Sequence, residues 1–223
     1  YDIAGNLLTD LYQEWQGGAW VDYLWDTNTY DLNDRILTSL TKIWQGSLWE
    51  NNHRDTYTYD GDGYLITYLQ ENWQTGAWVN YTKDTCTYDL AGKILTRLTK
   101  NWQTGAWVDM AKVTNTYDVN NNLLTSIKEV SQGGILVNNQ KLTYTNDASG
   151  NAITLVIEQW QAGAWVNFLR HNYSYDGNNN LISDVMDQWQ SGVWNTVARR
   201  TYTFDSHNNS IAGKFERFTN GNW

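Results

Sequence analysis

Residues 88–116 read YDLAGKILTRLTKNWQTGAWVDMAKVTNT, and this stretch decides the fold. It holds two runs of about ten residues rich in Thr, Val, Ile, Leu and Trp, which are typical of β-strands. Short turn signals separate the two runs. No apolar stripe at a spacing of three to four residues occurs, so no amphipathic helix is indicated. The stretch predicts a β-hairpin.

The same pattern returns every 29 residues without insertion or deletion. A fixed period of this size marks a repeat architecture, in which each unit packs on its neighbours. We expect a single repeat array over residues 1–223 with an incomplete last unit. The units start near residues 1, 30, 59, 88, 117, 146, 175 and 204.

The first turn of the quoted unit is W-Q-x-G-x-W, with Thr104-Gly105 at its centre. A two-residue tip ending in Gly suits a type I′ turn, which needs positive φ at both residues. That tip fixes the register, so Trp102 should face Trp107 and, further down, Leu98 should face Ala111. The other tips are Gly17-Gly18, Gly46-Ser47, Thr75-Gly76, Gly133-Gly134, Ala162-Gly163, Ser191-Gly192 and Asn220-Gly221.

This register predicts a ladder of facing Trp pairs. Such aromatic pairs stabilise a sheet by roughly 0.2–1 kcal/mol each beyond Ala pairs. The fifth unit has Ser131 and Leu136 instead and should be a weak point, while Trp25 lies outside both columns. The paired residues are Trp15 with Trp20, Trp44 with Trp49, Trp73 with Trp78, Trp102 with Trp107, Trp160 with Trp165, and Trp189 with Trp194.

The second turn carries Y-D-x-x-G/N-N. Its Asp can accept backbone N–H groups locally, and the later Gly or Asn suits a left-handed residue. The stretch 60–63 clusters oxygen ligands as a calcium loop does, but it lacks a bidentate Glu at the right distance. We therefore interpret the column as structural and predict no metal. Its members are Asp2, Asp31, Asp60, Asp89, Asp118, Asp147, Asp176 and Asp205.

Short links between strands favour an all-β antiparallel meander of about 15 strands, coiling as one continuous sheet or tube. The alternative is a closed up-and-down barrel. A propeller ranks last, because a 29-residue repeat is too short for a four-stranded blade. Strict alternation places Trp102, Lys100 and Leu98 on one face, and Met110 and Lys112 on the other.

The pattern Y-D-x-x-G-N-x-L at residues 1–8, with a variant at 88–94, resembles the YD repeat of Rhs and teneurin-type proteins. That resemblance implies hairpins spiralling into a large sheet or hollow shell. The pattern W-Q-x-G-A-W-V-N at residues 73–80 is similar to tandem repeats of bacterial surface proteins exported by the type IX secretion pathway. Together these resemblances imply a secreted or cell-surface bacterial protein.

Composition narrows the function classes. The net charge is −9 and the pI about 4.6, which argues against a nucleic-acid partner. No run of about 20 apolar residues is present, so we predict no membrane-spanning helix. Cys86 is the single cysteine, so no internal disulfide can form. The three histidines fall in different phases of the repeat and no catalytic spacing appears, so we predict no enzyme and no cofactor.

Two columns remain as candidate binding surfaces. An exposed Trp ladder could stack on sugar rings and bind glycans, although we favour a ladder that packs as core. A basic column could meet an acidic polymer, although we favour a solvated row balanced by carboxylates. We expect a structural region for adhesion or display, with its own kind or glycans as partners. The basic column is Arg54, Lys83, Lys112, Lys141, Arg170 and Arg199.

Overall fold

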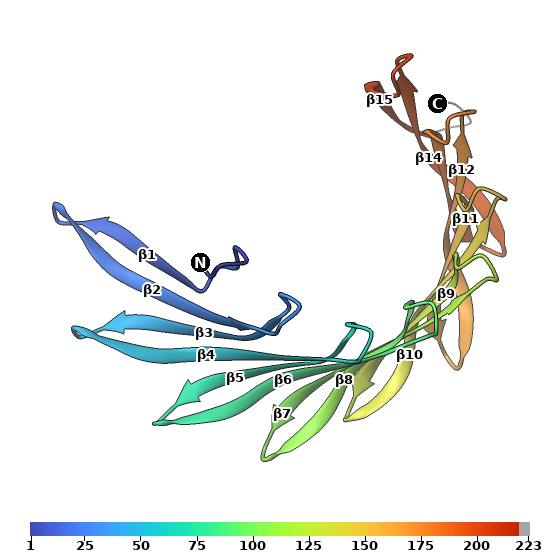
Figure 1. The fold of residues 1–223 in the computed structure, drawn as a ribbon. Helices are drawn as coiled ribbons and strands as arrows, with labels where there is room; N and C mark the ends of the chain where they lie inside the picture. Colours follow the sequence, from blue (N-terminus) through green and yellow to red (C-terminus); the bar gives the residue numbers. More distant parts are fainter. Residues whose placement is uncertain (219–223) are drawn as a thin grey trace. The chain divides into compact units, whose positions relative to one another are not determined.

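The computed structural model describes residues 1–218, and these form fifteen β-strands and no helix (Figure 1). No described segment is therefore a helix able to cross a membrane. The strands are β1 (Thr9–Gln16), β2 (Ala19–Tyr30), β3 (Ile36–Gln45), β4 (Leu48–Tyr59), β5 (Leu65–Gln74), β6 (Ala77–Tyr88), β7 (Ile94–Gln103), β8 (Ala106–Tyr117), β9 (Leu123–Gln132), β10 (Ile135–Asn146), β11 (Ala152–Gln161), β12 (Ala164–Tyr175), β13 (Leu181–Gln190), β14 (Val193–Phe204) and β15 (Ser210–Arg217).

The strands are hydrogen-bonded in sequence order as a single sheet, β1 through β15. Every pair whose register is defined is antiparallel, for example β3 with β4 and β4 with β5. The predicted meander of tandem hairpins is confirmed. The closed-barrel alternative is wrong, because β1 and β15 are the two ends of this order rather than neighbours. Two compact units divide the chain, residues 1–112 with 133–135, and residues 113–132 with 136–223.

The tip turns, which join the two strands of each hairpin, adopt the predicted conformation. At Thr104-Gly105 the φ angles are +47° and +86°. In Gly46-Ser47 the Gly is the first tip residue and Ser takes the usual place of Gly, yet the φ angles of +55° and +77° follow the same pattern. Positive φ at both positions defines the type I′ turn, whose twist matches that of the flanking strands. The tip at 220–221 lies outside the described residues.

A β-bulge interrupts each hairpin whose register is defined, and the sequence analysis did not anticipate it. In the third hairpin Glu71 faces Asn80 but Gln70 faces Thr82, which leaves Tyr81 as the extra residue. Such a bulge exchanges the two faces of the strand beyond it. In the five hairpins whose register is defined, an uninterrupted register is wrong. The predicted facing of Leu98 with Ala111 in the fourth hairpin stays a prediction. The extra residues are Tyr23, Asn52, Tyr81, Phe168 and Val197.

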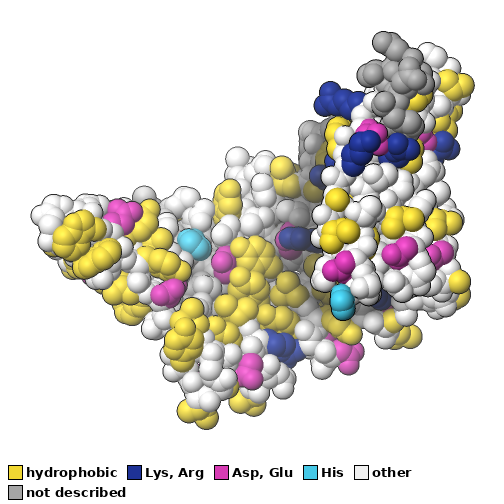
Figure 2. Space-filling model, turned by 90° about the horizontal axis from the view of Figure 1, so that it is seen from above, with side chains coloured by type: hydrophobic (Ala, Val, Ile, Leu, Met, Phe, Trp, Pro, Cys, Tyr) yellow, Lys and Arg dark blue, Asp and Glu magenta, His cyan; other side chains and the backbone are white. Residues whose placement is uncertain are grey.

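Neither unit has a conventional core. No large side chain among the described residues is fully buried, and apolar side chains lie open on the surface (Figure 2). A single layer of strands has no second layer to cover its faces, so the burial of any residue depends on its neighbours within the sheet. Stability must then come mainly from cross-strand pairs and inter-hairpin contacts. The buried side chains are Thr41, Asp84, Cys86, Asp184, Asp187 and Ala198.

Consecutive hairpins pair over only part of their length. Pairing of β4 with β5 runs from Tyr59 and Leu65 up to His53 and Asn72, whereas β4 itself begins at Leu48. The strands β6 and β7 pair up to Thr82 in the same way. The outer arms of neighbouring hairpins therefore diverge, as the spread tips of β3–β4, β5–β6 and β7–β8 show (Figure 1).

Candidate functional site

The Trp pairs lie on these arms, directly beside the tip turns. In six hairpins the two indoles meet edge to face, with ring centroids 5.0–5.4 Å apart. This is a favourable geometry for aromatic quadrupoles. Trp15 and Trp20, on the first hairpin, are 61% and 63% exposed, and the other ten are half-buried. The ladder thus holds each hairpin together while part of its surface stays accessible.

Cations lie over the Trp rings. The Arg54 guanidinium carbon is 4.7 Å from the Trp78 ring centroid, and that of Arg170 is 4.9 Å from Trp194. In the first hairpin Trp25 stands in the position of the basic column, 29 residues before Arg54, and the Lys42 ammonium lies 5.1 Å from its ring centroid. Our assignment of the basic column to the face opposite the Trp ladder is therefore wrong. The bulge in each second strand brings the column onto the Trp face, where cation–π contact is possible.

The basic column also binds carboxylates on the next hairpin, as the interpretation of a balanced row predicts. Arg54 donates to Glu71, with Nη2 and Oε2 2.5 Å apart, and the Lys141 and Glu158 charged groups are 2.8 Å apart. The Arg170 fork donates from Nε and Nη2 to one oxygen of Asp187, at 3.0 and 2.7 Å. These pairs cross from one hairpin to the next. We name them the charge ladder: Arg54–Glu71, Lys141–Glu158, Arg170–Asp187 and Arg199–Glu216.

A groove of about 770 Å³ opens between the arms of the second and third hairpins. Trp49 on β4 and Trp73 on β5 supply its aromatic surface, and Glu50, Asn51 and Lys42 supply polar groups. Strand divergence creates this groove, because β4 and β5 stop pairing at His53 and Asn72. Most of the lining residues are polar, so the groove differs from the mainly apolar pockets of drug-like ligands, but two aromatic rings among hydrogen-bonding groups suit a polar ligand with an apolar face. We call it the arm groove.

The base turns, which join consecutive hairpins, hold their aspartates as predicted. Asp2 Oδ1 accepts hydrogen bonds from the Ala4 and Asn6 backbone N–H groups, at 2.9 and 2.8 Å. The same two bonds recur in all eight base turns. The Asn6 side-chain amide and these N–H groups favour the charged carboxylate and lower the pKa of Asp2. Each carboxylate is thus used within its own turn.

The Tyr of the Y-D motif has a role that the sequence analysis missed. The Tyr59 hydroxyl donates to the Ile36 carbonyl oxygen at 2.8 Å, and the Tyr88 hydroxyl to the Leu65 carbonyl oxygen at 2.9 Å. Each bond ties one base turn to the end of the preceding one. Asn146, which replaces Tyr in its unit, donates its amide to the Leu123 carbonyl oxygen at 3.1 Å. The sequence shows only that Tyr recurs at this position, and it does not identify the backbone carbonyl 23 residues earlier as the acceptor.

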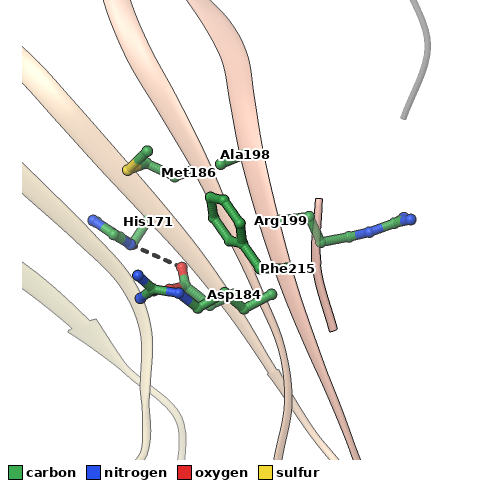
Figure 3. Close-up of a pocket in the computed structure, with 7 residues that line it drawn as sticks. His171, Asp184, Met186, Ala198, Arg199 and Phe215 are labelled. Atoms are coloured by element: carbon green, nitrogen blue, oxygen red, sulfur yellow. Dashed lines mark hydrogen bonds and ion pairs between the residues drawn. The ribbon is translucent and has the colours of Figure 1, made fainter. Parts of the chain in front are cut away.

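The face opposite the Trp ladder carries a second polar cluster in the later unit. His171 Nδ1 lies 2.8 Å from Asp184 Oδ1, and Phe215 stands beside Met186 (Figure 3). The Asp184 side chain is about 10% exposed, and Arg200 adds a weaker contact at 3.8 Å. The cavity there is only about 20 Å³, enough for a water molecule but not for a substrate. The cluster satisfies a buried carboxylate and offers no nucleophile.

No protein-family model and no curated protein matches this chain. Among solved structures, it is similar to a DUF3836 family protein from Bacteroides vulgatus, with 16% identity over 40% of this chain and 92% of that one, at a TM-score of 0.32. A porin-like protein from Bacteroides uniformis is 12% identical over 93% of this chain and 94% of that one, at a TM-score of 0.32.

A third similar structure is the TcdB2-TccC3 complex. It is 13% identical, with a TM-score of 0.38, and the match covers 90% of this chain. This chain spans only 15% of the length of that one. At TM-scores below 0.5 these likenesses carry no inference about function. The resemblance to YD repeats stays a prediction.

Proposed function

We propose that this chain is a structural repeat region of a secreted or cell-surface bacterial protein, acting as a stalk, fibre or shell for adhesion or display. The observation that supports this most directly is the reuse of the same contacts at successive junctions. A protein that bound or transformed one small molecule would need a one-off arrangement of side chains. Here the tip turns, base turns and charge ladder repeat with the period of the sequence.

The distribution of polar contacts supports the same proposal. Charge-assisted bonds such as Arg54 with Glu71 cross between hairpins, where a scaffold must resist separation. The tyrosine bonds add a second row of links between base turns. Junctions of this kind depend only on nearest neighbours, so an array can lengthen without a new core.

The test compares the chain with a tandem duplication of itself by negative-stain electron microscopy and small-angle X-ray scattering. We expect the longest dimension to grow nearly in proportion to chain length while the cross-section stays constant. Compact particles would contradict the proposal, that is, particles whose radius of gyration grows with chain length only as slowly as that of a globular protein. Immunogold labelling of the native cells should place the protein outside the cell.

The arm groove favours a second candidate function, binding of a glycan. Its Trp49 and Trp73 rings offer apolar faces for sugar rings, and Asn51 and Glu50 offer hydrogen-bond partners for hydroxyls. A glycan array would identify ligands, and Trp fluorescence titration would measure their affinity. We expect Trp73→Ala to weaken binding at least ten-fold. Leu48→Ala is the matched control, since this exposed tip side chain does not line the groove; equal effects of the two variants would eliminate the groove as the site.

A further inference from the structure

Two of the described junctions depart from the charge ladder: Trp25 faces Lys42 between β2 and β3, and two lysines face each other between β6 and β7. Where Arg54 and Lys141 each face an acid on the next strand, Lys83 on β6 lies directly opposite Lys100 on β7. Two like charges in facing positions of a sheet repel each other and destabilise the pair. The β6–β7 junction therefore presents two ammonium groups where the four junctions of the charge ladder present an ion pair.

Only one of these two lysines is neutralised. The Lys100 ammonium lies 2.9 Å from Asp109 Oδ1 on β8. Among residues 1–218, Lys83 forms no ion pair or hydrogen bond through its ammonium group, although its side chain is half-buried. On the other neighbouring strand, β5, the residue that faces Lys83 is Leu69. A partly desolvated cation without a counter-charge is a ready partner for an incoming anion.

The surroundings favour an anion carried on a ring. Trp102 lies two residues from Lys100 along β7 and therefore on the same face, with its ring edge to face with Trp107. The repeat sets Lys83 in the position on β6 that Arg54 holds on β4, where the guanidinium lies over a Trp ring. Ammonium groups next to indole surface can hold both an oxyanion and the apolar face of a sugar.

We propose that Lys83 and Lys100 bind a carboxylate or sulfate group of an acidic polysaccharide. The inference does not depend on the scaffold role. The chain's net charge of −9 repels a polyanion overall, so an acidic polymer can bind only where cations are paired locally, as Lys83 and Lys100 are. An inorganic anion would engage the ammonium groups alone and leave the indole surface unused.

The test measures binding of a sulfated polysaccharide, a uronate-containing polysaccharide and neutral dextran by isothermal titration calorimetry at low salt. Lys100→Glu places an acid opposite Lys83, as Glu158 lies opposite Lys141, although it also brings that acid close to Asp109. We expect at least ten-fold weaker binding of the acidic polymers. Glu158→Lys places a second lysine opposite Lys141 and should add a site. Circular dichroism and thermal melts check that both variants are folded.

Three results would overturn the proposal. The first is equal affinity of the native protein and folded Lys100→Glu for the acidic polymers. The second is equally tight binding of neutral dextran, which would remove the role of charge. The third is an equal rise in melting temperature with inorganic sulfate and with the sulfated polysaccharide at the same sulfate concentration. That result would show that the saccharide part contributes nothing to binding.

Discussion

Replacing Asp187 by Ala should be the most damaging single change in the charge ladder. Its carboxylate accepts four hydrogen bonds: two from Arg170, one from Asn172 at 2.9 Å and one from Thr196 at 2.8 Å. Breaking a buried ion pair costs about 3–5 kcal/mol, whereas exposed pairs contribute at most about 1 kcal/mol. The Asp187 side chain is 5% exposed and that of Arg170 is 34% exposed. Solvent on the Arg side lowers the expected loss to about 2–3 kcal/mol.

The assay is urea unfolding followed by far-UV circular dichroism, with the free energy of unfolding taken from the midpoint and slope. Glu158→Ala is the matched control, because its partner Lys141 forms the equivalent pair on the neighbouring hairpin. The Glu158 side chain is 17% exposed against 5% for Asp187, and it lacks the Asn172 and Thr196 donors, so its loss should cost less, about 1–2 kcal/mol. The double variant Arg170→Met/Asp187→Ala should recover part of the lost stability, since no uncompensated charge then remains.

Equal losses in Asp187→Ala and Glu158→Ala would refute this reasoning. They would mean that burial and the two extra donors, Asn172 and Thr196, add nothing to the Arg170 pair. The reasoning would also be refuted if the double variant recovered no stability. The expected loss in Asp187→Ala comes mainly from leaving the Arg170 guanidinium without a counter-charge, and the double variant removes that charge.

Three further predictions concern the turns. Tyr88→Phe should lower the free energy of unfolding by about 1 kcal/mol, because the Leu65 carbonyl oxygen loses its donor; an unchanged urea midpoint would contradict this. Thr104→Asn should raise it by about 0.5–1 kcal/mol, since Asn tolerates a positive φ better than a β-branched residue, and a lower melting temperature would count against that strain. Asn side-chain amides and backbone N–H groups lower the pKa of Asp2, Asp147 and Asp205 in the folded state. The stabilisation from each carboxylate is therefore present above its unfolded pKa of about 3.9 and is lost as pH falls from there through the lower folded-state pKa. Urea midpoints from pH 5 downwards should therefore fall, and less steeply in Asp147→Asn than in the native protein; identical slopes would show that the turn carboxylate is not responsible.

The sequence predicts the hairpins, the tip register and the aspartate turns because these depend on local chemistry. A Gly at the second tip position and an Asp at the start of a base turn each act within about five residues. The facing of Trp73 and Trp78 follows directly from the tip.

The sequence did not predict the bulges, because an extra residue such as Tyr81 looks like any other strand residue. One missed bulge exchanges the faces of everything beyond it, which is why the basic column was assigned to the wrong side. A usable signal existed: Arg54 and Glu71 are separated by 17 residues, and equivalent opposite charges recur at Lys141 and Glu158. The burial of the Trp ladder could not be predicted for a different reason, because periodicity alone does not say whether a second layer covers a sheet.

The tyrosine bonds have a consequence for how the protein would respond to tension. If the array is pulled from its two ends, its hairpins should unfold one at a time, because each is held by the same kind of tyrosine hydrogen bond. Each unfolding event should release one 29-residue repeat. At about 3.5 Å per residue, that corresponds to a sawtooth force trace with a spacing of about 100 Å. The hairpin closed by the shorter Asn146 amide should give way early, so the molecule would lengthen in steps rather than break.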